Sequence, residues 1–265
     1  VLDVGCGAGR LGEALKARQA CEVIGIEYDP RAAARARKRI DQVIVGDVEQ
    51  LDAEFEPGRF DAAVCGDILE HLRTPEKLLR RIRRWLRPGG TLVASVPNVR
   101  HHSVAGTLLG GNWTYESAGL LDQDHVRFFT RRELEKLIYR AGFALDELQA
   151  VPGPGDDDWF RGDRTGEVRI GGLRIAGLPP GDADEFHTYQ FLARARRAEA
   201  FERPMTSIVI VTYNQLPYTR LCVDSILRLT DEPYELIFVD NGSTDGTPHY
   251  LRTVPGAQVI LNEEN

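Results

Sequence analysis

Short apolar runs and helical patterns alternate along the first 150 residues of the chain. The runs VLDV, EVIGIE, QVIV, FDAAVCG and TLVASVP have the length and composition of buried strands. Helical patterns fill the intervals, from about Ala8 to Arg18, over PRAAARARKRI and over TPEKLLRRIRRWL, and the last of these is terminated by RPGG. This alternation predicts an α/β fold with a parallel sheet and helices on both faces.

The next part of the chain contains signals that start and end a helix. Thr130 and Glu133 form a T-x-x-E capping box, and Gly142 is placed to end the helix that follows. The runs ALDELQAV and HTYQFLARAR indicate two further strands, and we expect the second to close the sheet. Residues 152–185 between them are rich in Gly, Pro and Asp, which predicts an irregular insertion. We expect the aspartates at 156–158 to lie in a solvated loop rather than to bind a metal.

A polar stretch separates this first domain, residues 1–197, from a second one. After a linker at 198–204 the βα pattern restarts in SIVIVTYN, continues through YTRLCVDSILRL and YELIFVDNGSTDG, and stops after AQVIL. Residues 205–265 are therefore predicted to form the first part of a second α/β unit. Because the first residue already lies in a strand pattern, and the chain stops just after another, we interpret the sequence as a segment of a longer protein.

Composition and charge narrow the class of protein. Of the 265 residues, 42% are hydrophobic and 28% are charged, as in an ordinary globular protein. No apolar run approaches the roughly 18 residues of a membrane span, and no signal-peptide pattern begins the chain. The four cysteines lack metal or disulfide spacing, which predicts reduced thiols and a cytoplasmic location. A net charge of -7 argues against nucleic acid as a partner.

The chain opens with a glycine loop in VLDVGCGAG. Its glycines are Gly5, Gly7 and Gly9, led by Asp3 at the end of the first strand. Arg10 stands where a dinucleotide-binding loop has its third glycine, which argues against an NAD-dependent oxidoreductase. A carboxylate at this place repels a pyrophosphate but can accept a hydrogen bond from an ammonium group. The loop therefore predicts a ligand with a cationic or amino-acid-like end.

Two further acids end the next strands. Glu27 ends EVIGIE, where a carboxylate can accept both hydroxyls of a ribose, and Asp47 follows QVIV, where it can accept from an adenine amino group. Ligands of open α/β sheets bind at the carboxyl ends of the strands. We therefore expect Asp3, Glu27, Asp47 and the turn at Gly66 and Asp67 to face one crevice.

These segments resemble class I S-adenosylmethionine-dependent methyltransferases, in particular the branch that contains the ubiquinone-type O-methyltransferases. The resemblance covers residue 1 to about 197 and rests on VLDVGCGAG, Glu27, GDVEQL, FDAAVCGDILEHL and LRPGGTLVASVPN. It implies a Rossmann-like, doubly wound sheet of seven strands whose last strand is antiparallel. It also implies that S-adenosylmethionine is the cofactor and that its site is lined by Asp3, Gly5, Gly7, Gly9, Glu27, Asp47, Val48, Gly66 and Asp67.

Methyl transfer to a hydroxyl requires that the acceptor lose its proton or that its oxygen be coordinated. Asp67, Glu70 and His71 lie at i, i+3 and i+4, on one face of a predicted helix, and His125 precedes the capped helix. In some relatives a similar E-x-x-E-H helix holds a divalent metal. The resemblance thus implies a Mg²⁺ or Mn²⁺ site at Asp67, Glu70, His71 and His125. With aspartate in the first position, a second interpretation stays open, in which Asp67 and Glu70 cap the helix and His71 packs.

The candidate catalytic residues are His125, Glu70 and His71. An imidazole titrates close to neutrality, so His125 can act as a metal ligand or as a general base. A lone histidine is also a common structural residue, and both interpretations of His125 stay open.

A loop-like stretch between the fifth strand and the capped helix is the candidate acceptor region. It contains Trp113, Tyr115, His101 and His102 together with Gly pairs. This composition suits a lid or an acceptor pocket in which aromatic faces stack on a sugar ring. It equally suits a surface loop pinned by its aromatic residues.

The second unit resembles the start of a family 2 glycosyltransferase of the GT-A type, in SIVIVTYNQ, ELIFVDNGSTDGT and VILNEEN. The resemblance implies that Thr212, Asn214 and Asp240 contact the nucleotide of a sugar donor. The family's D-x-D metal motif and catalytic base fall beyond residue 265, so we expect no sugar transfer from this fragment alone.

The two resemblances together predict a function. We expect O-methylation of a small molecule, glycan or glycan precursor, such as a cell-surface polysaccharide, because the methyltransferase is joined to a glycosyltransferase that uses a nucleotide-sugar. One alternative is a non-catalytic module that binds S-adenosylmethionine and scaffolds the glycosyltransferase. Another is a metal-dependent RNA 2′-O-methyltransferase, whose binding to RNA ends the acidic net charge disfavours.

Overall fold

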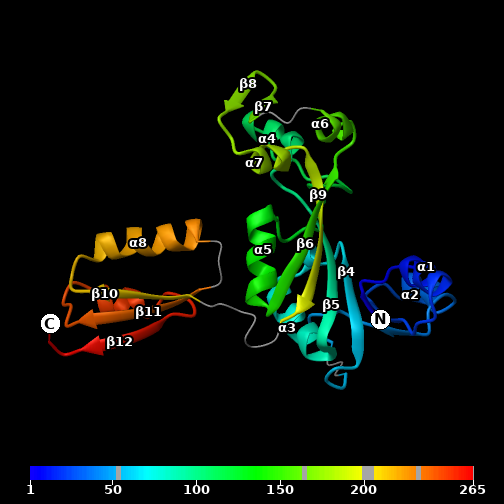
Figure 1. The fold of residues 1–265 in the computed structure, drawn as a ribbon, viewed down its shortest axis with the longest axis horizontal. Coiled ribbons are helices and arrows are strands. Elements are labelled where there is room, and N and C mark those ends of the chain that lie inside the picture. The colour runs from blue at the N-terminus through cyan, green and yellow to red at the C-terminus, as the bar shows by residue number, and fades with distance from the viewer. Residues whose placement is uncertain (52–54, 163–165, 199–205, 231–233, 265) are drawn as a thin grey trace. The chain divides into compact units, whose positions relative to one another are not determined.

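The computed structural model describes residues 1–51, 55–162, 166–198, 206–230 and 234–264. The chain divides into two compact units, Val1–Ala200 and Phe201–Asn265 (Figure 1). The predicted linker at 198–204 lies outside the described residues except for its first position. Among the described helices, none combines the length and the apolar character that crossing a membrane requires.

A seven-stranded sheet forms the centre of the first unit. Its strands lie in the order β3-β2-β1-β4-β5-β9-β6, and β9 runs antiparallel to both of its neighbours. The other pairings are parallel. The predicted doubly wound α/β sheet with an antiparallel last strand is therefore confirmed. The strands are β1 (Leu2–Val4), β2 (Ile24–Glu27), β3 (Gln42–Val45), β4 (Phe60–Gly66), β5 (Leu86–Pro97), β6 (Phe143–Pro152) and β9 (Thr188–Arg197).

Helices cover both faces of this sheet because its strands present apolar side chains on each side. Along β2, Ile24 and Ile26 belong to the larger core, whereas Gly25 between them packs toward Ile40 on the opposite face. A Cβ at Gly25 would lie 2.8 Å from Ile40 Cδ1, so only glycine admits this close approach. The helices are α1 (Arg10–Arg18), α2 (Pro30–Ala36), α3 (Pro75–Trp85), α4 (His102–Leu109), α5 (Arg131–Arg140) and the single 3₁₀ turn η1 (Leu69–His71).

The predicted start and stop of α5 are those that the structure shows. The Thr130 side chain accepts a hydrogen bond from the backbone N–H of Glu133 at 3.4 Å, which satisfies one of the free donors of the first turn. Gly142 follows the helix with φ +96°, in the left-handed region that favours glycine. Its carbonyl accepts from Nε of Arg83 at 2.9 Å, which ties the end of α5 to α3.

The insertion between β6 and β9 is more ordered than the sequence predicted. It contains α6 (Asp157–Arg161), a hairpin of β7 (Glu167–Ile170) and β8 (Leu173–Ala176), and α7 (Pro180–Glu185). Together with α4 these elements gather at the start of β9 (Figure 1). The expectation of an irregular segment was wrong because a few apolar residues, among them Val168, Ile170 and Phe186, form a small core of their own.

The second unit is a three-stranded parallel sheet in the order β10-β11-β12. Its strands are β10 (Thr206–Thr212), β11 (Tyr234–Asn241) and β12 (Gln258–Asn262), connected by α8 (Leu216–Leu229) and α9 (Thr247–Leu251). Val223 of α8 and Leu251 of α9 pack on Leu236 and Phe238 of β11. This is the βαβαβ pattern that the sequence predicted for the region.

Candidate active site

The glycines of the loop after β1 have two different structural roles. Gly5, Gly7 and Gly9 all have positive φ, between 54° and 75°, which suits glycine. A Cβ at Gly9 would lie 2.9 Å from the Cα of Ala36, so this glycine allows α1 and α2 to approach each other. A Cβ at Gly7 would meet nothing within 4 Å. Gly9 therefore serves packing, and Gly7 borders open space.

The Asp3 carboxyl group is buried near the end of β1, one residue before Val4. Only 4% of the residue is exposed, and its Oδ2 atom lacks a hydrogen-bond partner. Burial, and secondly the charge of Glu27, raises the pKa of Asp3 from 3.8 to about 6. An uncompensated buried carboxylate of this kind is costly unless a ligand brings a positive charge to it.

Glu27 at the end of β2 holds the loop in place. Its Oε2 atom accepts from the backbone N–H of Gly7 at 2.7 Å, and its Oε1 atom accepts from Asp29 N–H at 2.8 Å. Each oxygen of a carboxylate has two lone pairs, so both oxygens keep one acceptor position for a ligand.

The remaining predicted cofactor residues follow β3 and β4. Asp47 accepts from the backbone N–H of Glu49 and from the Gln50 side chain, each at 2.9 Å, and Val48 is buried in the core. At Gly66 a Cβ would approach only Ser95 Oγ, at 3.9 Å, so the backbone there is open. The structure thus brings these predicted positions to the carboxyl ends of adjacent strands β1, β2, β3 and β4.

Asp67 ends β4 in a conformation that is uncommon for a residue with a side chain. Its φ is +50°, and it is held there because its Oδ1 atom accepts from Ser95 Oγ at 2.9 Å and from Gln190 Nε2 at 2.5 Å. Outliers of this kind cluster at functional sites. Sequence reasoning missed Ser95 and Gln190, since nothing in their local sequence indicates that they hold Asp67.

Three of the four predicted metal ligands come together. Glu70, His71 and His125 each offer one ligand atom, and these atoms lie within 4.8 Å of one another. Asp67 is outside this group. The helix expected over these residues is only the 3₁₀ turn η1, whose N-cap position is Ile68 without a side-chain hydrogen bond. The capping interpretation of Asp67 and Glu70 was therefore wrong, because the positive φ of Asp67 turns the chain before the helical turn begins.

The Glu70 carboxyl group resembles Asp3 in its surroundings. The residue is 1% exposed, and its Oε2 atom has no hydrogen-bond partner. Burial raises the pKa of Glu70 to about 8, with a further contribution from the charge of Asp67. A cation at this position would supply the missing counter-charge.

Both histidines of the group are anchored through the same ring nitrogen. His71 Nδ1 lies 3.1 Å from the carbonyl of Asp124, and His125 Nδ1 lies 3.3 Å from the carbonyl of Leu120. A carbonyl only accepts, so Nδ1 carries the hydrogen and Nε2 keeps its lone pair in each neutral ring. Burial, and secondly the neighbouring His71, lowers the pKa of His125, which favours that neutral form. Metal-binding histidines have this arrangement.

The predicted acceptor residues divide into two groups. Trp113 and Tyr115 are exposed, and Trp113 meets Phe128 edge-on with ring centroids 5.4 Å apart. His101 and His102 instead lie with Asp156, which is buried rather than solvated as expected. The physical reason is that Asp156 accepts hydrogen bonds from segments far away in the sequence.

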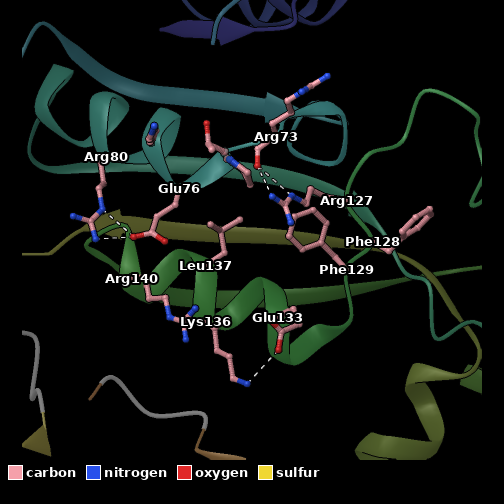
Figure 2. A pocket seen from close by; sticks show the side chains of 13 residues that line it. Arg73, Glu76, Arg80, Arg127, Phe128, Phe129, Glu133, Lys136, Leu137 and Arg140 are labelled. Carbon is pink, nitrogen blue, oxygen red and sulfur yellow. Dashed lines mark hydrogen bonds and ion pairs between the residues drawn. The ribbon is translucent and has the colours of Figure 1, made fainter. Parts of the chain in front are cut away.

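A separate pocket of about 630 Å³ lies between α3 and α5 (Figure 2). Two of its cations are paired along their own helices, Arg80 with Glu76 at 2.6 Å and Lys136 with Glu133 at 3.2 Å. None of the predicted cofactor or metal residues lines it. Its lining consists of Arg73, Thr74, Pro75, Glu76, Lys77, Arg80, Arg127, Phe128, Phe129, Glu133, Lys136, Leu137 and Arg140.

In the second unit, the predicted nucleotide-sugar residues belong to one network. Asp240 Oδ1 accepts from Thr212 Oγ1 at 2.8 Å and from Ser243 Oγ at 2.6 Å, and Asn214 Oδ1 accepts from Thr244 N–H at 2.9 Å. Burial opposes ionisation of Asp240, but the hydrogen bonds from Ser243 and Thr212 hold its pKa below the usual value. The backbone N–H of Asn214 also donates to Ser243 Oγ at 2.6 Å, so the three predicted residues are joined at the carboxyl ends of β10 and β11.

A glycine loop after the first strand, acids ending the following strands and an antiparallel β9 define the class I methyltransferase architecture. The chain belongs to the methyltransferase family: its residues 1–148 match the family described as "Methyltransferase domain". Residues 207–265 match the family described as "Glycosyl transferase family 2". The predicted fusion of these two kinds of sequence is confirmed.

Several curated relatives carry the name ubiquinone biosynthesis O-methyltransferase. The one from Cereibacter sphaeroides is 32% identical over 169 residues, covering 62% of this chain and 68% of the relative. The one from Aeromonas salmonicida is 29% identical over 157 residues, covering 57% of this chain and 65% of the relative. The chain therefore spans about two thirds of the length of these relatives.

Solved structures agree on the fold. An S-adenosylmethionine-dependent methyltransferase from Mesorhizobium loti is 21% identical with a TM-score of 0.50, covering 74% of this chain and 90% of that one. Another from Methanosarcina mazei is 18% identical with a TM-score of 0.50, covering 74% of this chain and 91% of that one.

Proposed function

We propose that residues 1–197 transfer the methyl group of S-adenosylmethionine to an oxygen atom of a glycan or glycan precursor. Residues 205–265 then begin a nucleotide-sugar-binding domain, connected through a linker at 198–204. The observation that carries this proposal is the buried Asp3 carboxyl group beside the glycine loop, whose Oδ2 atom lacks a partner.

The cofactor fits the residues at the carboxyl ends of β1 to β3. Asp3 would accept from its amino group, whose positive charge offsets the cost of burying the carboxylate. Glu27 would accept from the ribose hydroxyls with the acceptor positions that Gly7 and Asp29 leave free. Asp47 would accept from the adenine amino group. Bound there, S-adenosylmethionine supplies an electrophilic methyl group, and alignment of the acceptor with it provides much of the rate.

Of the two ions expected from the resemblance, Mn²⁺ fits Glu70, His71 and His125 better than Mg²⁺, because two of the three ligands are imidazoles. The unpartnered Glu70 Oε2 and the two Nε2 lone pairs are donors of the required kind. When bound, the ion would hold the acceptor oxygen and lower the pKa of its hydroxyl group. Without it, the neutral His125 imidazole can take the acceptor proton as a general base.

The glycan class of acceptor rests on two observations. The chain continues into a glycosyltransferase family 2 sequence, in which Thr212, Asn214 and Asp240 would hold the nucleotide of the donor. In the candidate acceptor region, Trp113 and Tyr115 expose aromatic faces of the kind that stack on sugar rings. The name ubiquinone biosynthesis O-methyltransferase describes the relatives above, and the proposed acceptor of this chain does not rest on it.

The cofactor is tested first, by calorimetric titration with S-adenosylhomocysteine and with NADH. We expect the first ligand alone to bind the native chain, and Glu27→Ala to weaken that binding. Glu22→Ala is the matched control, since Glu22 lies on the surface and pairs with Arg59. Equal binding of NADH, or unchanged binding to Glu27→Ala, would contradict the proposed cofactor site.

Transfer is then tested with labelled S-adenosylmethionine on glycans, nucleotide-sugars and RNA ends. We expect label on a glycan or nucleotide-sugar, and loss of transfer but not of cofactor binding in His125→Ala. Turnover that persists in EDTA would remove the metal from the proposal and leave His125 as the base. Cofactor binding without transfer to any acceptor would favour the scaffold, and label on RNA would favour the RNA methyltransferase.

A further inference from the structure

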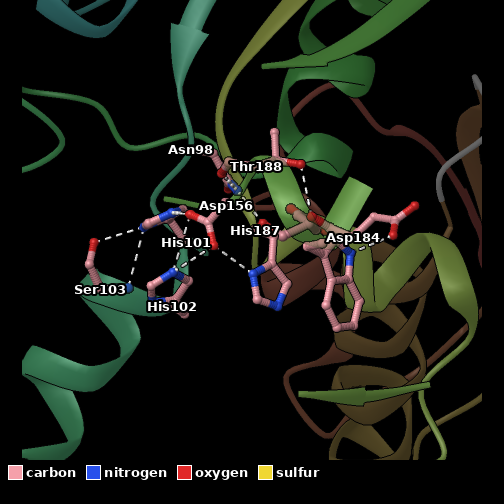
Figure 3. A network of polar contacts seen from close by, with 10 residues as sticks. Asn98, His101, His102, Ser103, Asp156, Asp184, His187 and Thr188 are labelled. Atoms are coloured by element: carbon pink, nitrogen blue, oxygen red, sulfur yellow. Dashed lines mark hydrogen bonds and ion pairs between the residues drawn. The ribbon is translucent and has the colours of Figure 1, made fainter. Parts of the chain in front are cut away.

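Three of the six histidines of the chain converge on one carboxylate at the base of the insertion (Figure 3). His101 Nε2 lies 2.9 Å from Asp156 Oδ2, and His102 Nε2 lies 3.1 Å from Oδ1 and 3.3 Å from Oδ2 of the same residue. His187 Nδ1 lies 2.7 Å from Asp156 Oδ1 on the other side. These residues come from the start of α4, from the turn before α6 and from the residue before β9.

Two of the imidazoles and the carboxylate are spaced as ligands of one ion. The ligand atoms of His101, His102 and Asp156 lie within 4.8 Å of one another. Ligand atoms that share one ion at about 2.1 Å are roughly 3.0 to 3.4 Å apart. The distances from Asp156 to these two imidazoles are close to that range, so small side-chain movements would complete the geometry.

Outer partners hold two of these ligands, His101 and Asp156, in place. His101 Nδ1 lies 2.8 Å from Ser103 Oγ and accepts from the backbone N–H of Ser103 at 3.3 Å, and both contacts orient the ring with Nε2 toward Asp156. His187 occupies the second oxygen of Asp156, and its ring stacks on Trp159 with centroids 4.0 Å apart. Metal-binding histidines and carboxylates characteristically have such supporting partners.

A glycine lies directly against two of these ligands. A Cβ at Gly153 would lie 2.5 Å from His101 Nε2 and 2.6 Å from Asp156 Oδ2, so no other residue fits without moving the cluster. The His101 and Asp156 side chains are almost fully buried, whereas that of His102 is 36% exposed. An ion could therefore enter from the His102 side and keep water in its remaining coordination positions.

We propose that this cluster binds a divalent transition-metal ion, with His101, His102 and Asp156 as its ligands and His187 as a positioning residue. Two imidazoles and one carboxylate favour Zn²⁺, Co²⁺ or Fe²⁺ over Mg²⁺ or Ca²⁺. The ion would join α4 to the insertion and hold the insertion against the start of β9. It shares no residue with the Glu70, His71 and His125 group and does not depend on the proposed methyl transfer.

The test uses Co²⁺, whose visible absorption reports its ligands, on the full chain with His71→Ala and His125→Ala in place. These two substitutions remove the imidazoles of the other group. We expect one equivalent of Co²⁺ to remain after gel filtration, and its absorption to be lost when Asp156→Asn or His102→Ala is added. His249→Ala, on α9 of the second unit, is the control and should leave binding unchanged.

The folding of each variant is checked by tryptophan fluorescence, because Trp159 stacks on His187 in this cluster. If Asp156→Asn does not fold, the proposal is judged on His102→Ala alone, because the His102 side chain is more exposed than that of Asp156. Failure to retain Co²⁺ in the background variant would overturn the proposal, as would full retention by His102→Ala. Neither outcome bears on the Glu70 group, whose metal is assayed separately by methyl transfer in EDTA.

Discussion

Replacing Asp3 by asparagine should remove a pH-dependent loss of stability from the free protein while it weakens cofactor binding. Burial raises the pKa of Asp3 from 3.8 to about 6, so its ionisation costs about 3 kcal/mol of folding free energy above pH 6. The folded state binds the proton more tightly than the unfolded state does. The free energy of unfolding of the native chain therefore falls as the pH rises from 3.8 to 6, and this contribution is constant above that range.

An asparagine side chain cannot ionise, so the free energy of unfolding of the Asp3→Asn variant does not fall in this way as the pH rises. Escaping this loss favours the variant by about 2 kcal/mol at pH 5 and by about 3 kcal/mol at pH 8. The buried amide carries its own cost of about 1–3 kcal/mol, which does not change with pH. The difference of about 1 kcal/mol between the two pH values is therefore the quantity that tests the burial argument.

The assay is urea unfolding at pH 5 and pH 8, followed by tryptophan fluorescence. All three tryptophans, Trp85, Trp113 and Trp159, belong to the first unit, so the signal reports that unit alone. Calorimetry at pH 8 should show S-adenosylhomocysteine binding about 10- to 100-fold weaker, because a charged hydrogen bond is lost. The same stability difference at both pH values would refute the burial argument, and unchanged affinity would refute the contact of Asp3 with the ligand's amino group.

Four further substitutions test the packing and hydrogen bonding. Gly9→Ala should destabilise the first unit by about 2–4 kcal/mol in urea, because its Cβ would collide with Ala36 in addition to the positive φ. Gly7→Ala, with equal φ strain but open space, should cost only about 1–2 kcal/mol, and equal costs would contradict the packing role. Thr130→Ala removes the cap of α5 and should lower stability by about 1 kcal/mol; an unchanged urea midpoint would count against the cap. Asp240→Asn should cost the second unit about 1.5–3 kcal/mol, seen as faster hydrogen exchange in β10 and β11, and unaltered exchange would show that the network is not stabilising.

The positions of the proposed cofactor residues could be predicted because each lies close to the carboxyl end of a strand. Asp3 is the second-last residue of β1, Glu27 ends β2, and Asp47 follows β3 after one glycine, so strand order alone brings them to one edge. The environment of Asp3 could not be predicted in the same way. Its raised pKa depends on how completely other segments exclude water from it, which no local pattern records.

The residues around Glu70 show the same difference between what local sequence predicts and what the tertiary structure decides. Its closeness to His71 follows from their adjacency in the sequence, but His125 is 55 positions away from Glu70 and reaches it only through the fold. The expected helical face failed because Asp67, held by Ser95 and Gln190 from β5 and β9, has a positive φ. Contacts between distant strands overrode the local spacing rule.

What the sequence by itself determined is the order and type of most elements, the glycine loop and the two family resemblances. These depend on local periodicity and on residues that are close along the chain. Only the tertiary structure decided that Asp156 is buried, because His101, His102 and His187 arrive from 55, 54 and 31 positions away to donate hydrogen bonds to it. A carboxylate in a Gly- and Asp-rich stretch resembles a solvated one until its distant partners are known, since burial and hydrogen bonding are properties of the whole packed unit.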